Sequence, residues 1–269
     1  SWTAANTVVI GHAAMDAGAT QDGTVAIGKS ALNALTTGAR NTVIGYTAAD
    51  VLTGGSDNVV IGYNALGAQA GTGTTSKGDG NIAIGKDAMS LVNAGTHNSA
   101  VADSNIAIGT GALKGGAFSG ANHLEGNIAI GYQSLDATGT TACTGSTAVG
   151  HRTLSSANHA GSQGSTAIGY KALEALTEGA GNTAVGFEAG DALTTGEKNT
   201  ALGYQALSFG ATETDENVAI GYQAMYNNWG NEAVNDCVAI GSQALDGVTT
   251  SDASGSVAIG HSALGALTE

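Results

Sequence analysis

Residues Asn81 to Gly85 read Asn-Ile-Ala-Ile-Gly, and the same five residues return at Asn127 to Gly131. Variants of this motif recur through the whole chain of 269 residues, and each copy ends on a glycine. Successive motif glycines lie 17 to 24 residues apart, and 17 is the commonest spacing. One structural unit per repeat, with connections of variable length, explains this pattern. The motif glycines are Gly11, Gly28, Gly45, Gly62, Gly85, Gly109, Gly131, Gly150, Gly169, Gly186, Gly203, Gly221, Gly241 and Gly260.

The residues before each motif glycine predict a short β-strand. The preceding residue is always Ile, Val or Leu, the one before it Ala or Val, and the next Val, Ile or Thr. Short β-branched runs between Asn and Gly are typical of strands, and the frequent glycines disfavour helix. Each repeat should therefore form one coil that stacks on the next, about 4.8 Å further along the axis. The predicted fold is all-β, a parallel β-roll or solenoid of about fourteen coils.

The two faces of each strand predict two buried surfaces. Alternate residues of a strand point to opposite faces, so the Val and Ile of Val-Ala-Ile share one face and Ala takes the other. Both faces are apolar, which is typical of strands covered on both sides. We assign the Val and Ile face to the interior of the coil and the alanine face to contact with identical chains. A lone solenoid with one solvated face is the alternative.

The motif resembles that of a known family of adhesins. The runs that end at Gly85, Gly109, Gly131 and Gly221 are similar to the Asn-Ser-Val-Ala-Ile-Gly repeat of trimeric autotransporter adhesin heads, the YadA-like family. The run Gly-Tyr-Gln-Ala-Leu that begins at Gly203 is also similar to repeats in phage tail-fibre proteins. The resemblance implies a left-handed parallel β-roll wound as a homotrimer, outside the cell or on a virion fibre. The residues that we then expect to pack in the trimer are Ala83, Ala107, Ala129, Ala167 and Ala219.

Composition argues against several classes of partner. The net charge is −14, and the eight Lys and Arg residues are spread singly, so no basic patch is available to bind nucleic acid. No apolar run reaches the roughly 18 residues of a membrane span. Cys143 and Cys237 lie in different repeats and match neither a disulfide framework nor a metal motif. We interpret them as unpaired small apolar residues and leave their redox state open.

The chain shows no pattern of catalytic or metal-binding residues. The histidines are scattered, and His12, His151 and His261 share one repeat position in coils that are not adjacent. We interpret these three as exposed polar residues. Calcium binding in the acidic loop at 213–216 stays open, although the calcium-binding nonapeptide repeat is absent. We predict no catalytic, cofactor or metal site, and we do not expect an enzyme.

Two features are candidates for binding. Six of the seven tyrosines directly follow a motif glycine, and Tyr170, Phe187, Tyr204 and Tyr222 then form an unbroken column over four coils. Such a column either stacks on sugar rings or packs the coils together. The insertions that lengthen some repeats are the second feature, since insertions of this kind often map to a binding face. In or beside them we single out Phe118, His123 and Trp229 as surface-binding candidates.

These observations predict a non-enzymatic, extracellular fibre or head segment that attaches to cells or surfaces. The partners we expect are identical chains and a receptor on a host cell or surface, which includes glycans. The alternatives are a structural filament whose binding lies elsewhere, and a carbohydrate-active β-helix enzyme. Residues 1–269 read as one repeat array, and Ala266–Glu269 repeats the mid-coil run Ala175–Glu178, so we expect a segment of a longer array.

Overall fold

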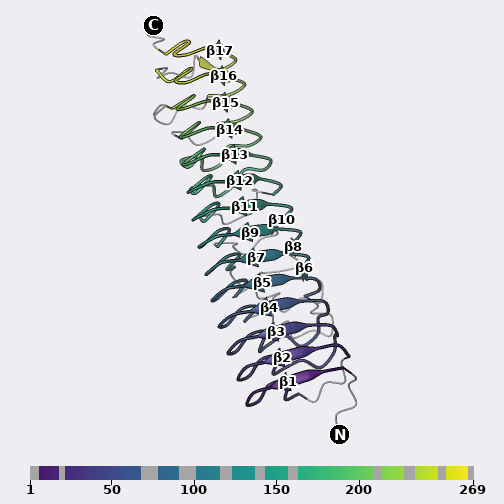
Figure 1. The fold of residues 1–269 in the computed structure, drawn as a ribbon. Helices are drawn as coiled ribbons and strands as arrows, with labels where there is room; N and C mark the ends of the chain where they lie inside the picture. The colour runs from purple at the N-terminus through teal and green to yellow at the C-terminus, as the bar shows by residue number, and fades with distance from the viewer. Residues whose placement is uncertain are drawn as a thin grey trace. The chain divides into compact units, whose positions relative to one another are not determined.

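The computed structural model describes residues 6–17, 22–67, 78–90, 101–115, 123–136, 143–156, 163–208, 214–226, 234–247 and 253–265. Within these ranges the chain is all-β and has no α-helix. The chain divides into two compact units, Ser1–Gly145 and Ser146–Glu269. Each unit is a parallel β-solenoid in which every repeat contributes one short strand to a main sheet (Figure 1). The predicted all-β solenoid is confirmed, while the fourteen-coil count, the left-handed winding and the homotrimer stay predictions.

Unit 1 contains a main sheet and a smaller side sheet. The main sheet has the order β1-β2-β3-β4-β5-β7-β9, and the side sheet has the order β10-β8-β6. The side-sheet strands come from the three consecutive repeats that end at Gly109, Gly131 and Gly150. The strands are β1 (Val8–Ile10), β2 (Val25–Ile27), β3 (Thr42–Ile44), β4 (Val59–Ile61), β5 (Ile82–Ile84), β6 (Val101–Asp103), β7 (Ile106–Ile108), β8 (His123–Glu125), β9 (Ile128–Ile130) and β10 (Cys143–Thr144).

Unit 2 continues the same motif in a single described sheet. Its strands pair in parallel in the order of the sequence, from β11 to β17. The register joins equivalent motif positions, as in Ala167 beside Ala184 and Ala184 beside Ala201. The strands are β11 (Thr147–Val149), β12 (Thr166–Ile168), β13 (Thr183–Val185), β14 (Thr200–Leu202), β15 (Val218–Ile220), β16 (Val238–Ile240) and β17 (Val257–Ile259).

The interior of each coil is thin, and alanine and leucine fill it. The central strand residue, such as Ala129, is fully buried in the single chain, and so are most alanines and leucines three and four residues past the motif glycine. Ala172 and Leu173 illustrate this second pair. The long Leu or Met side chain fills most of the interior, and the strand contributes a small side chain to it, Ala in eleven repeats and Val in three. Leu173 also has φ of +52°, a left-handed turn that closes the coil.

The motif glycine is required because successive coils meet backbone to backbone at this position. A Cβ atom on Gly169 would overlap the carbonyl oxygen of Gly186, and Gly186 meets Gly203 in the same way. The φ angle of Gly169 is +137°, which side-chain-bearing residues rarely adopt. Sterics and backbone conformation therefore both select glycine.

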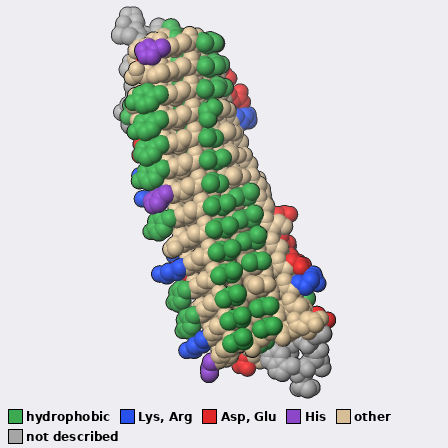
Figure 2. Space-filling view, viewed as in Figure 1, with side chains coloured by type: hydrophobic (Ala, Val, Ile, Leu, Met, Phe, Trp, Pro, Cys, Tyr) green, Lys and Arg blue, Asp and Glu red, His purple; other side chains and the backbone are tan. Residues whose placement is uncertain are grey.

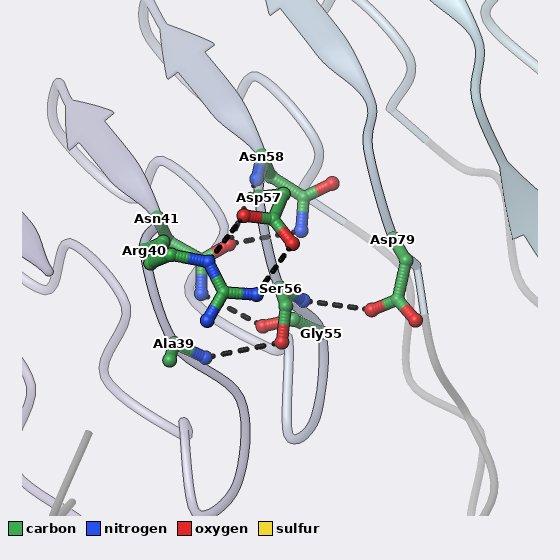
Figure 3. Close-up of polar contacts among 8 residues, drawn as sticks. All are labelled: Ala39, Arg40, Asn41, Gly55, Ser56, Asp57, Asn58 and Asp79. Carbon is green, nitrogen blue, oxygen red and sulfur yellow. Dashed lines mark hydrogen bonds and ion pairs between the residues drawn. The ribbon is translucent and has the colours of Figure 1, made fainter. Parts of the chain in front are cut away.

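Buried asparagines link the coils four residues before the motif glycine. Asn58 donates from Nδ2 to Oδ1 of Asn41 at 2.9 Å, and its backbone N–H donates to the same oxygen at 3.1 Å (Figure 3). Nδ2 of Asn41 in turn donates to the Gly55 carbonyl at 2.7 Å. Every polar group of the buried amide thus has a partner, which is what burial demands. This amide ladder comprises Asn41, Asn58, Asn81, Asn105 and Asn127 in unit 1 and Asn182, Asn199 and Asn217 in unit 2.

Candidate functional site

The outer sheet face is the most extensive apolar surface among the described residues. We define it as the first and third residues of each main-sheet strand, which point away from the coil interior. In unit 1 the first position is aliphatic in every strand except β3, where it is Thr42. In unit 2 four consecutive strands place threonine there, and the third position is Val, Ile or Leu throughout. Figure 2 shows the resulting lines of hydrophobic side chains along this face.

This arrangement reverses our assignment of the two strand faces. Ile130 is 36% exposed in the single chain, whereas the neighbouring Ala129 is 0% exposed. A side chain that is fully covered by its own chain has no surface left for a partner, so the alanine row does not form the predicted contact between chains. The residues concerned are Ala83, Ala107, Ala129, Ala167 and Ala219, and all five are fully buried. The missed signal was the bulky Leu or Met that stands four residues past the motif glycine in twelve of the fourteen repeats and fills the interior.

The aromatic residues after the motif glycine form the predicted column in unit 2. Ring centroids are 4.9 Å apart between Tyr170 and Phe187, 5.1 Å between Phe187 and Tyr204, and 5.4 Å between Tyr204 and Tyr222. The planes are within 13° of parallel. His151, which we had interpreted only as an exposed polar residue, extends the column because its ring lies 5.3 Å from that of Tyr170.

Stacking limits the ring surface of this column that a ligand could contact. Each inner ring is covered on both faces by its neighbours, so it presents mainly its edge. Exposure rises from 39% at Tyr170 to 50% at Tyr222, the last of the five stacked rings. The geometry therefore favours the packing role for the inner rings, and a free ring face remains only where the column stops.

A line of polar side chains runs beside the rings, one residue further along each coil. Gln205 donates from Nε2 to Oε2 of Glu188 at 2.8 Å, and Gln223 donates from Nε2 to Oε1 of Gln205 at 3.0 Å. At one end, Glu174 forms ion pairs with Arg152 and Lys171, at 3.0 and 2.9 Å. Charged groups thus flank one end of the column, and neutral amides flank the other.

The loop candidates are only partly within the described residues. His123 is the first residue of β8, the middle strand of the side sheet, and its side chain is exposed. Phe118 and Trp229 lie outside the described residues, so their role as binding residues stays a prediction.

Several carboxylates stand in unusual surroundings. Burial raises the pKa of Asp103, while the hydrogen bond of 2.8 Å that its carboxylate accepts from the Asp79 backbone N–H partly lowers it. Burial also raises the pKa of Asp191, although Ser208 donates a hydrogen bond of 2.7 Å to its carboxylate. In the acidic loop, Asp215 accepts from the backbone N–H of Glu197 at 2.7 Å. Asp103 and Asp215 thus accept hydrogen bonds from backbone N–H groups of neighbouring coils, whereas Asp191 accepts one from a side chain.

The described residues contain no group of three or more His, Cys, Asp or Glu side chains arranged to hold a metal ion. Cys143 and Cys237 are both buried, and neither forms a disulfide bond. The Cys237 thiol donates to the Ala253 carbonyl at 3.0 Å, and burial raises its pKa. In the part of the chain that the structure describes, no helix is long and apolar enough to cross a membrane.

The fold and its surfaces define the chain as a repeat-built parallel β-solenoid with an apolar outer sheet face and a stacked aromatic column. Comparison with protein-family models, with curated proteins and with solved structures finds no match. The resemblance to adhesin heads and tail fibres therefore stays an expectation from the motif.

Proposed function

We propose that this chain is a segment of a non-enzymatic, extracellular attachment fibre, carried on a cell surface or a virion, in which identical chains associate through the outer sheet face. The observation that carries the proposal is the apolar character of that face, at both strand positions over most of unit 1 and at the third position throughout unit 2. Monomeric proteins rarely leave an extended apolar patch open to water. Parallel sheets are, moreover, normally covered on both faces.

A second copy of the chain suits this face better than an unrelated partner does. An identical solenoid repeats at the same rise per coil, so its aliphatic rows match these rows along the whole sheet. Closed rotational symmetry then buries every copy of the face at once. We propose three chains, as the adhesin-like motif implies, with the row of Ile44, Ile61 and their counterparts at the contact in place of the alanines.

The oligomer is tested by sedimentation of the intact chain and of Ile130→Asp. We expect a trimer for the parent and a dissociated, still folded chain for the variant, because an unpaired carboxylate would enter a dry contact. Ala129→Asp is the matched control, and it should unfold the coil because Ala129 lies inside. A monomeric parent, or an unchanged trimer in Ile130→Asp, would refute this interface.

Attachment is assigned to the surface outside the contact. Rigid elements that position variable segments are a common arrangement for binding, and the repeats differ most in their insertions. Between Gly62 and Gly131 the three repeats are 22 to 24 residues long, against 17 in the shortest units. The partner is a receptor on a cell or surface, and the candidates include glycans.

Shortening these three repeats to the 17-residue unit tests the role of the insertions. The main-sheet strands should persist, since β5, β7 and β9 pair independently of the insertion lengths. Attachment to target cells or immobilised glycans should fall. If the shortened protein attaches as well as the parent, the insertions carry no binding, and the aromatic column or the alternative of a structural filament gains support.

A further inference from the structure

The aromatic column in unit 2 lacks one ring. Its stacked rings end at Tyr222, the next coil carries Ser242 at the same position, and the coil after that carries His261. The register is fixed by backbone hydrogen bonds, because Gln243 N–H donates to the Tyr222 carbonyl at 2.8 Å and Ser262 N–H donates to the Ser242 carbonyl at 2.9 Å. Two residues able to stack thus flank a position that holds only a hydroxymethyl group.

The size of this gap matches one ring. Stacked rings in this column are 4.9 to 5.4 Å apart, one coil rise per ring. Tyr222 and His261 are two rises apart, roughly 10 Å by the usual spacing of strands. A flat or chair-shaped ring above Ser242 would then lie about 5 Å from each flanking ring, within the range at which rings stack favourably. The 50% exposure of Tyr222, higher than that of Tyr170, Phe187 or Tyr204, fits a face left uncovered.

The corresponding gap in unit 1 is already filled. Lys29 lies between His12 and Tyr46 in the same register, and its Nζ stands 5.5 Å from the centroid of the Tyr46 ring. Further along, Lys86 and Thr110 separate Tyr63 from Tyr132, so no two rings there flank a single empty position. Among the described residues, only Ser242 leaves one position open between two rings.

Neutral polar groups surround the open position. Gln223 and Gln243 belong to the adjoining polar line, and Ser262 follows His261, whose Nδ1 is 3.1 Å from the Ser262 hydroxyl. Gln243 continues the line of Gln205 and Gln223, but its amide makes no hydrogen bond among the described residues. Amides and hydroxyls at the rim, with ring faces above and below, suit a ligand that has C–H faces and several hydroxyls.

We propose that this open position, which we call the ring gap (Tyr222, Ser242, His261 and the rim residues Gln243 and Ser262), binds a neutral pyranose at the exposed end of a glycan. The sugar takes the place of the missing ring, with its C–H face on Tyr222 and its hydroxyls on the Gln243 amide and the serine hydroxyls. The inference rests on the proposed attachment function and specifies the chemistry that the attachment would use.

The test uses the intact chain with four simple probes: methyl β-D-glucopyranoside, methyl β-D-galactopyranoside, methyl α-D-mannopyranoside and methyl N-acetyl-β-D-glucosaminide. Saturation-transfer NMR should show binding of at least one probe. Ser242→Tyr supplies the missing ring and should weaken that binding at least tenfold without unfolding the chain. Tyr222→Phe keeps the ring face and should retain binding, whereas Tyr222→Ala should lose it.

Thr110→Tyr is the matched control, because it adds the same ring at the same register in unit 1, and it should leave sugar binding unchanged. The inference is overturned if no probe binds the parent, if Ser242→Tyr binds as well as the parent, or if Thr110→Tyr weakens binding equally. A parent that attaches to surfaces yet binds no probe refutes the ring gap and leaves the proposed function standing. A parent that binds a probe through the ring gap but attaches to no surface confirms the ring gap and refutes the attachment function.

Discussion

At the scale of single residues, the repeat contains two kinds of glycine, and glycine is needed at each for a different physical reason. Gly169 has φ of +137° and would clash with the next coil if it carried a Cβ atom. Gly164 also has a positive φ, +68°, but a Cβ atom there would meet nothing within 4 Å. The first glycine is required by close approach of two backbones, and the second only by its own backbone conformation.

This difference predicts unequal costs for the same substitution. Gly164→Ala should lower the free energy of unfolding by about 1 kcal/mol, the usual penalty of a left-handed alanine. Gly169→Ala should lower it by about 3 kcal/mol or more, because backbone has to move to make room. Urea denaturation followed by circular dichroism compares the two variants, and equal losses would contradict the steric role of the motif glycine.

Asp50 provides a second prediction at this scale. Its Oδ1 is buried without a hydrogen-bond partner, and burial raises the pKa of the carboxyl. A carboxyl whose pKa is raised by folding opposes folding once it is ionised, so the penalty is present at neutral pH and disappears at low pH. Asn33, at the same register one coil earlier, donates from Nδ2 to the Ala13 carbonyl at 2.9 Å.

Asp50→Asn should therefore stabilise the protein at pH 7 by about 1 kcal/mol, since the new amide can donate to the Ser30 carbonyl as Asn33 does to that of Ala13. The difference in unfolding free energy between variant and parent should shrink as the pH falls through the raised pKa of Asp50. A gain that is constant from pH 7 to pH 3 would show that removal of the charge is not its cause.

At the scale of elements, the amide ladder shows how one polar position joins neighbouring coils. Its register continues to Thr24, whose Oγ1 is buried without a partner. Thr24 thus marks a place where the ladder is interrupted by a side chain too short to reach the next coil. An unsatisfied buried hydroxyl is destabilising. An asparagine at position 24 could donate from Nδ2 to the Gly38 carbonyl, just as Asn41 donates to the Gly55 carbonyl.

Thr24→Asn should accordingly raise the free energy of unfolding by about 1 kcal/mol. Asn81→Ala is the converse change, and it should lower that free energy by about 2 kcal/mol or more, because Oδ1 of Asn58 loses a donor and Asn105 loses the oxygen to which its backbone N–H and its Nδ2 both donate. Chemical denaturation of both variants measures the two effects. A loss of stability in Thr24→Asn would mean that the ladder cannot be extended at this coil.

The sequence was sufficient to predict the strands, because the period of the motif and its β-branched residues act within each coil. It was not sufficient to say which strand face points inward. Alternation places Ala129 and Ile130 on opposite faces of the strand but does not say which face points into the coil. That depends on how much space Leu135 leaves inside the coil. The aromatic column was predictable from register alone, whereas the ring gap required knowledge that the rings stack face to face.

At the scale of the whole molecule, a stack whose coils contact only their neighbours should tolerate the loss of one complete coil. Removing the 17 residues from Thr183 to Asn199 joins Asn182 to Thr200 and restores every register. The shortened chain should keep its β spectrum and lose only a small part of its stability. Removing the eight residues from Asp191 to Lys198 breaks the register and should unfold the neighbouring coils, as thermal melts of both variants would reveal.

The amide ladder also bears on the order in which the coils can fold during synthesis. In each step, the Oδ1 atom of one asparagine accepts from the asparagine of the following coil, as Asn199 accepts from Asn217 at 3.1 Å. The Nδ2 group donates forward too, as Asn199 does to Thr214 at 2.6 Å. A chain that leaves the ribosome N-terminus first can therefore complete each amide as soon as one further coil has emerged. At any length of the nascent chain, only the ladder asparagine of the last coil to emerge still lacks its hydrogen bonds to a following coil.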